Sequence, residues 1–234
     1  SIVHLAKYKD GRPGVWKESI GSSSTLYENN VRLKREYEIL KTLSDEGIRN
    51  VPEIFCSDTK KNDSGNEARV LLMELIDGIS LSKVLEDNEE TGVLERYKPL
   101  GPEKSLKIFG ELCVILEEMA DLPEPIYHRD INPRNIMVRG KQKGVVLIDF
   151  GLAKEIKSGK DVSKTTGKTP GWSPPERDVG VSGGFTDVYS MGQLLWCMLT
   201  GCCNRQYMEK LGKDTGRDSD FIRGKIEEAL GMIE

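Results

Sequence analysis

Three polar residues in the second half of the chain have the types and the spacing needed to handle a phosphate group. Asp130 lies in the segment HRDINPRN (residues 128–135), five residues before Asn135, and Asp149 ends an apolar run two residues before Gly151. Asn135 and Asp149 offer the oxygen ligands that Mg²⁺ prefers, and Mg²⁺ fills its other positions with water and substrate phosphates. Asp130 is then left to accept a proton from a substrate hydroxyl. Each residue alone is better explained as a turn cap, but the three together predict phosphoryl transfer.

The same segments carry a resemblance. HRDINPRN followed by IDFG (148–151) resembles the catalytic loop and the metal-binding loop of the protein kinase family, and one short strand hairpin separates them, as is usual there. The resemblance implies an α+β, bilobal fold with a small, mostly antiparallel β lobe that contains one helix, and a larger helical lobe. It also implies ATP and Mg²⁺ as cofactors and a protein substrate as partner.

Lys17 and Glu36 extend the resemblance into the first half of the chain. Lys17 in GVWKES lies where the family has its strand lysine, and Glu36 lies where it has a helix glutamate. Independently of the family, Leu33, Glu36, Leu40 and Leu43 follow a helical spacing, so that Glu36 falls on the apolar face, where a carboxylate is costly unless it is paired. We predict a Lys17–Glu36 ion pair that places the lysine on the α- and β-phosphates. The alternative is that Glu36 lies at the edge of this face and reaches water.

The segment MELI (73–76) resembles the hinge that binds adenine, with Met73 as the gatekeeper residue. The resemblance implies that backbone groups of Glu74 and Ile76 meet the adenine edge. The faces of the ring would then contact three apolar side chains: Val3, Val15 and Met137. Ordinary core packing is a competing interpretation of this apolar set.

Downstream segments match the family as well. TPGWSPPE (169–176) resembles the substrate-docking segment, and DVYSMG (187–192) resembles the start of a buried helix, with Asp187 expected to bind backbone amides of the catalytic loop. His128 and Phe150 are expected to pack in an apolar spine that joins the lobes. Arg129 places a cation beside Asp130, and a phosphate on one of three nearby hydroxyls is expected to pair with it. These acceptors are Ser163, Thr165 and Thr166.

The catalytic loop departs from the family at one position. Asn132 stands where Ser/Thr kinases usually carry a lysine, so one cation near the γ-phosphate is missing, and Arg134 matches a position where many tyrosine kinases keep an arginine. Thr169 favours a Ser/Thr kinase, because its hydroxyl is expected to bond Asp130. We therefore predict Ser/Thr specificity and include Asn132 and Thr169 in the catalytic set.

The two ends of the sequence also depart from the family. The glycine-rich phosphate loop is absent, and the alignment places Ser1 near its last glycine, so the chain is expected to begin just inside the domain. It is expected to stop within a late helix, before the arginine that would pair with Glu176. We expect one domain truncated at both ends, with a first lobe at 1–76 and a second at 77–234.

Hydrophobic periodicity predicts the elements that position these residues. Residues 1–20 read as a hairpin with a KDGRPG turn, and 25–43 as a helix. Strands are expected at VPEIFCSD and ARVLLMEL, and short strands at IMV and VVLIDF. Helices are expected at SLSKVLED, at PEKSLKIFGELCVILEEMADL, at DVYSMGQLLWCMLTG and at the C-terminal end, whereas 152–186 reads as a long irregular segment.

Composition narrows the function further. The 234 residues include 37% hydrophobic and 31% charged residues with a net charge of −4, which argues against the basic stripe of a nucleic-acid binder. The five cysteines lack disulfide or zinc-site spacing, and no apolar run is long enough to span a bilayer, so we expect a cytoplasmic protein. Two alternatives remain beside an active kinase: a pseudokinase that acts as a scaffold, and a small-molecule kinase.

Overall fold

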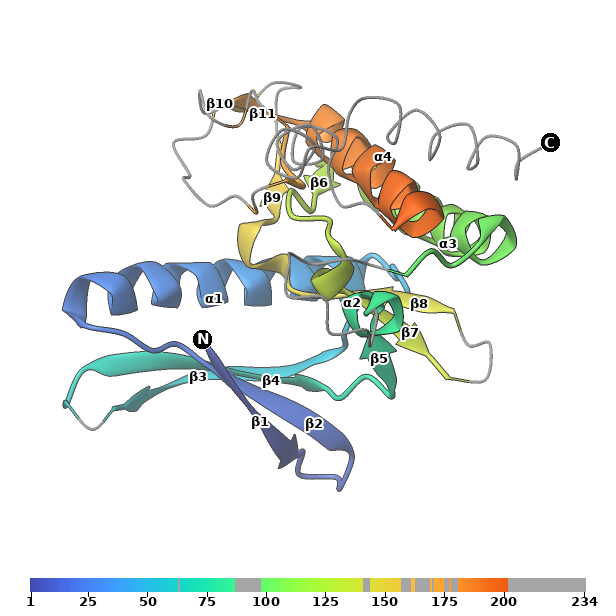
Figure 1. Ribbon diagram of the computed structural model, residues 1–234. Coiled ribbons are helices and arrows are strands. Elements are labelled where there is room, and N and C mark those ends of the chain that lie inside the picture. The colour runs from blue at the N-terminus through green and yellow to red at the C-terminus, as the bar shows by residue number, and fades with distance from the viewer. Residues whose placement is uncertain are drawn as a thin grey trace, which may run out of the picture.

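The computed structural model describes residues 1–201 apart from 63, 87–97, 141–143, 157–160, 163–168, 170, 175–176 and 178–180. The first lobe has one antiparallel sheet with strand order β1-β2-β4-β3 (Figure 1). Its strands are β1 (Ile2–Lys7), β2 (Pro13–Glu18), β3 (Ile54–Lys61) and β4 (Glu67–Glu74). In the turn between β1 and β2, Gly11 has a φ of 88°, which a side chain would disfavour. Strand β4 lies between β2 and β3, and its consecutive residues 70–73 are all buried, so side chains on both of its faces are shielded from water.

Helix α1 (Ser23–Asp45) packs along the sheet and also faces the second lobe (Figure 1). Its Leu33 is buried against Leu71 and Met73 of β4. About two turns further along α1, Leu40 and Leu43 belong to the main core, which continues through the second lobe. The two lobes therefore share one apolar core through the C-terminal half of α1.

In its described residues, the second lobe holds a small sheet with strand order β5-β7-β8 and three α-helices. Its strands are β5 (Gly78–Ser80), β7 (Ile136–Arg139) and β8 (Val145–Leu147). Its helices are α2 (Leu81–Leu85), α3 (Pro102–Ala120) and α4 (Gly184–Thr200). Proline at the first position of α3 lacks the N–H that would be unsatisfied there anyway, which explains why this helix begins at Pro102. Helices α3 and α4 lie side by side (Figure 1).

The expected α+β architecture is confirmed, but the expectation for residues 152–186 was incomplete. Three two-residue strands lie there: β9 (Lys154–Glu155), β10 (Asp161–Val162) and β11 (Val181–Ser182). Strand β9 pairs with β6 (Ile126–Tyr127), and β10 pairs with β11. Pairs this short depend on distant partners, so a local pattern does not reveal them. Strand β5 was likewise missed, because it has only three residues.

The remaining expectations are settled only in part. The expected C-terminal helix, Cys202 and Cys203 lie outside the described residues. In the described part of the chain, Cys56, Cys113 and Cys197 carry no disulfide. Each helix that the structure describes is too short or too polar to cross a bilayer.

Candidate active site

Lys17 and Glu36 form the ion pair that the helical pattern predicts. Lys17 Nζ lies 2.9 Å from Glu36 Oε1 and 2.8 Å from Oε2. Glu36 is only 1% exposed, so it lies on the buried face of α1 and not at its edge. Burial alone would lower the pKa of Lys17, but the carboxylates of Glu36 and Asp149 outweigh burial and raise this pKa. The lysine is therefore held as a cation inside the protein.

Asn30, six residues before Glu36, fixes α1 to the sheet. Its Oδ1 accepts hydrogen bonds from Ser19 Oγ at 2.5 Å and from the Arg69 backbone N–H at 2.7 Å. Its Nδ2 donates to the Glu67 carbonyl at 2.8 Å. One side chain thus joins α1 to β4 and to the end of β2, the strand that carries Lys17. Sequence reasoning missed Asn30, although an asparagine inside a helix is unfavourable and invites a search for its partners.

Asp130 lies in the loop at 128–135 and is held from two sides. Its Oδ1 accepts a hydrogen bond of 2.6 Å from Thr169 Oγ1, the contact expected from the sequence. Its Oδ2 accepts one of 2.9 Å from Asn135 Nδ2, which also donates to the Asp130 carbonyl at 2.8 Å. Because the amide nitrogen of Asn135 is used in this way, its Oδ1 is the atom that can meet a cation.

Asn132, which stands where Ser/Thr kinases usually carry a lysine, is bonded to backbone groups of its own loop. Its Nδ2 donates to the Asp130 carbonyl at 3.0 Å, and its Oδ1 accepts from the Arg134 N–H at 3.0 Å. It caps the short 3₁₀ helix Pro133–Asn135 and is 2% exposed. Asn132 therefore stabilises the conformation of the loop, and its expected part in catalysis stays a prediction.

Asp187, at the start of α4, holds the loop at 128–135 through its backbone. Its carboxylate accepts backbone hydrogen bonds of 2.7 Å from His128 and 2.6 Å from Arg129, as expected. Burial raises the pKa of Asp187, while these two bonds act in the opposite direction. Arg129 is 1% exposed and has a φ of 67°, which is rare and costly for a residue other than glycine. The bonds to Asp187 compensate for this strain and keep the loop in place.

Asp149 follows β8 and joins the two halves of the site. Its φ of 64° turns the chain sharply, and its Oδ1 lies 3.0 Å from Lys17 Nζ. Burial acts to raise the pKa of Asp149, but the charge of Lys17 outweighs it, so the pKa lies below its usual value. The next residue, Phe150, is fully buried and packs edge-on against the His128 ring at 4.8 Å. This contact is the expected part of the spine between the lobes.

A cavity of about 270 Å³ brings together five of the predicted site residues. These are Lys17, Glu36, Asp130, Asp149 and Thr169. Arg32, one turn before Glu36 on α1, and Asn29, two turns before it, also line the cavity and were missed by sequence reasoning. Their signal was the helical spacing, which places residues 29, 32 and 36 on neighbouring faces.

The predicted adenine set, although described, lies outside the lining of this cavity. Val3 pairs with Lys17 across β1 and β2, and Val15 lies two residues before Lys17. Both valines therefore lie on the same face of the sheet as Lys17. Met73 is 6% exposed and packs in the core with Leu33, while Ile76 is 8% exposed. Met137 is half-buried on β7 between β5 and β8. Core packing thus explains Met73 at least as well as contact with a base.

Comparison with known proteins decides the family. A family model described as the protein kinase domain matches residues 2–219. The chain belongs to the protein kinase family. It is 30% identical over 82% of its length to the human serine/threonine-protein kinase Nek2, and 27% identical over 86% to serine/threonine-protein kinase PknB of Mycolicibacterium smegmatis. It is also 28% identical over 90% to a seven transmembrane domain-containing tyrosine-protein kinase of Dictyostelium discoideum.

These relatives are longer proteins. The match to this chain spans 41% of the Nek2 length and 30% of the PknB length. Four residues with expected roles lie outside the described part of the chain: Ser163, Thr165, Thr166 and Glu176. Their pairing with Arg129 or with a distant arginine therefore stays a prediction.

Proposed function

We propose that this kinase domain transfers the γ-phosphoryl group of ATP to Ser or Thr hydroxyls of protein substrates, with Mg²⁺. One observation carries the proposal: Lys17 Nζ lies 2.8 Å from Glu36 and 3.0 Å from Asp149, in a cavity that Asp130 also lines. A cation, a metal-binding carboxylate and a carboxylate base in one cavity are the parts that phosphoryl transfer requires.

Asp130 is the proposed base. It accepts the proton of the substrate hydroxyl as the oxygen attacks the γ-phosphorus and the bond to the β-phosphate oxygen breaks. Thr169 and Asn135 hold its two oxygens at 2.6 and 2.9 Å, so the carboxylate has one orientation. Lys17 contributes a fixed positive charge for the α- and β-phosphates, and Glu36 fixes the direction of Lys17.

The donor atoms fit Mg²⁺. Asn135 Oδ1 and the Asp149 carboxylate are hard oxygen donors, and half of the Asp149 side chain (48%) is exposed. When bound there, the ion would supply positive charge to the β- and γ-phosphates. Arg32 lines the same cavity from α1 and brings a second cation to it beside Lys17.

The preference for Ser or Thr rests on Thr169. Its hydroxyl donates to Asp130 from the segment expected to dock substrates, and the relatives Nek2 and PknB are named serine/threonine-protein kinases. The tyrosine kinase among the relatives makes this preference a point to test directly.

The test is transfer of radiolabelled phosphate from ATP to peptides that differ only in Ser, Thr or Tyr at the acceptor position. We expect labelling of the Ser and Thr peptides, loss of labelling with EDTA, and a decrease of about 10²–10⁴-fold in kcat for Asp130→Asn. Nucleotide binding without transfer would instead indicate a pseudokinase. Labelling of a small-molecule acceptor but of no peptide would indicate a metabolite kinase.

A further inference from the structure

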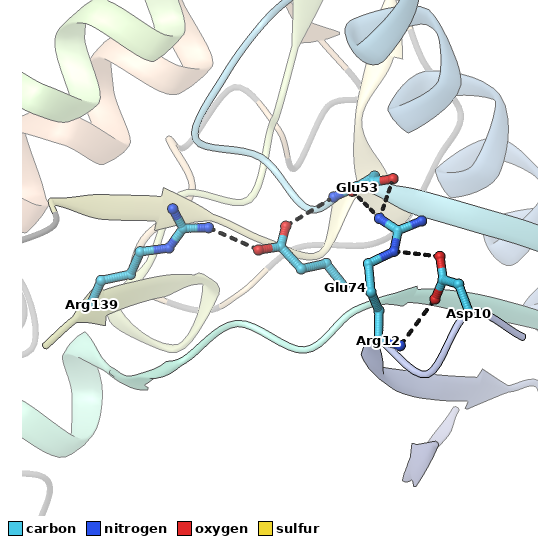
Figure 2. A network of polar contacts seen from close by, with 5 residues as sticks. All are labelled: Asp10, Arg12, Glu53, Glu74 and Arg139. Atoms are coloured by element: carbon cyan, nitrogen blue, oxygen red, sulfur yellow. Dashed lines mark hydrogen bonds and ion pairs between the residues drawn. The ribbon is translucent and has the colours of Figure 1, made fainter. Parts of the chain in front are cut away.

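A row of charged residues runs along the side of the molecule where the two lobes are joined (Figure 2). Glu74, the last residue of β4, lies at its centre. Its Oε1 accepts a hydrogen bond of 3.0 Å from Arg139 Nη2, and its Oε2 accepts one of 3.3 Å from the backbone N–H of Glu53. We refer to Glu53, Glu74 and Arg139 as the hinge clasp.

The clasp joins elements of different lobes. Glu53 lies just before β3 and Glu74 ends β4, so both belong to the sheet of the first lobe. Arg139 ends β7, in the small sheet of the second lobe, where it pairs with Gly78 of β5. A bond between Glu74 and Arg139 can therefore form only when the lobes have a particular relative orientation.

The connection that the clasp spans is short and fixed at its far end. Only residues 75–77 lie between Glu74 and β5. Gly78 pairs with Arg139 across β5 and β7, and a Cβ atom on Gly78 would lie 2.5 Å from the Val138 carbonyl, so the two strands approach too closely here for a side chain. With Gly78 fixed by packing and Glu74 fixed by Arg139, the hinge has little freedom left.

A backbone hydrogen bond near the hinge clasp also joins the two lobes. The Leu147 N–H of β8 donates to the Asn50 carbonyl at 2.9 Å, which ties the segment before Glu53 to the second lobe. Farther out, Arg12 holds both oxygens of Glu53 at 2.8 Å, and its guanidinium lies 4.4 Å above the Phe55 ring. Arg12 thus neutralises the Glu53 carboxylate, which would otherwise repel Glu74.

The Glu74–Arg139 bond of the hinge clasp and the Lys17–Asp149 contact between the lobes occur in the same structure. Lys17 of the first lobe lies 3.0 Å from Asp149 of the second, while Arg139 and Glu74 are bonded at the hinge. The lobe orientation that the clasp favours is therefore the one in which the two halves of the active site meet. Glu74 and Arg139 are both partly buried, at 31% and 25% side-chain exposure, which makes their ion pair stronger than one on the open surface.

We infer that Glu74 and Arg139 are positioning residues that hold the hinge and the lobes in the ATP-binding orientation. The inference rests on the proposed function for its link to ATP. It assigns the side chain of Glu74 a task separate from that of its backbone, which the sequence places at the adenine edge. Loss of the clasp weakens ATP binding more than it slows the chemical step, because Asp130 and its partners lie elsewhere.

The test compares Glu74→Gln, Arg139→Met and the double variant with the wild-type protein. We expect KM for ATP to rise about three- to ten-fold in each single variant, with kcat changed less than about two-fold. The double variant should have a KM no higher than that of the more impaired single variant, because both changes remove the same ion pair. Lys60→Met, which breaks the Lys60–Glu18 pair of 2.7 Å within the first lobe, is the matched control and should leave KM unchanged.

A second measurement needs no phosphate transfer. Hydrogen exchange of the backbone amides at 75–78, in nucleotide-free protein, should be faster in both single variants and unchanged in Lys60→Met. An unchanged KM together with unchanged exchange, additive effects in the double variant, or a higher kcat on removal of the clasp would overturn the inference. If the wild-type protein transfers no phosphate, the proposed function fails, whereas the exchange measurement still decides whether the clasp holds the hinge.

Discussion

The two halves of the candidate active site are held together in different ways. In the first lobe, Lys17 and Glu36 come from separate elements, β2 and α1, and meet only because α1 packs on the sheet through Leu33 and Asn30. In the second lobe, Asp130 and Asn135 belong to one loop and bond each other directly. The first half is therefore sensitive to a shift of one helix, whereas the second changes only if the loop itself is released.

Among the variants that change how each half is supported, the largest effect is expected in the first lobe, where Lys17 and Glu36 meet through helix packing. Lys17→Met removes the charge near the phosphates and should lower phosphate transfer about 10²–10³-fold. It also leaves Glu36, which is 1% exposed, without its cation, and should lower the free energy of unfolding by about 3–5 kcal/mol. Urea unfolding and radiolabelled transfer measure the two effects separately.

A matched double variant separates stability from catalysis in this half. Lys17→Met combined with Glu36→Met replaces the buried ion pair by apolar groups, so stability should return close to the wild-type value. Phosphate transfer should stay as low as in Lys17→Met. Recovery of transfer would show that the pair serves only to support the helix.

The second half is tested at Asp187, which supports the loop without touching a substrate. Asp187→Ala leaves the amides of His128 and Arg129 unsatisfied and should cost about 2–4 kcal/mol of stability. Asp187→Asn keeps an acceptor oxygen and should cost less. Hydrogen exchange should increase at 128–135 but not at Lys17. Equal increases in both lobes would show that the two halves of the site are not supported independently.

A smaller effect is expected at the contact between the catalytic loop and the docking segment. Thr169→Val removes the 2.6 Å bond to Asp130 and should lower kcat about ten-fold, since a hydrogen bond to a charged group is worth about 1.5–3 kcal/mol. Thr169→Ser retains the hydroxyl and should retain most of the activity. If Val and Ser variants behave alike, the methyl packing of Thr169 matters and its hydroxyl does not.

The same comparison explains which parts the sequence could predict. The residues of the second half were found from the sequence because Asp130, Asn132 and Asn135 are neighbours in one motif, although the bonds from both asparagines to Asp130 were not predicted. The Lys17–Glu36 pair was predictable for another reason: a carboxylate on an apolar helix face requires a cation nearby.

Other contacts left no local signal. Asn30 binds backbone groups of β4 that are 37 and 39 residues away, and Glu74 meets Arg139 across 65 residues. Nothing in the periodicity around Glu74 distinguishes it from any polar residue at a strand end. The two-residue strands are hidden for the same reason, because each is defined by a partner and not by its own sequence.

The smallest effect concerns the pH dependence of the contact between the two halves. The charge of Lys17 lowers the pKa of Asp149 below its usual 3.8, so this contact stabilises the fold above about pH 3.8 and is lost as the pH falls through the lower, folded pKa. The raised pKa of Lys17 has the opposite sign: its contribution is complete below about pH 10.5 and is lost as the pH rises through the higher, folded pKa. Lys17→Met should therefore flatten both ends of the stability profile, measured by urea unfolding across the pH range. A variant with an acid limb as steep as that of the wild-type protein would show that other carboxylates, and not the bond between the lobes, govern acid stability.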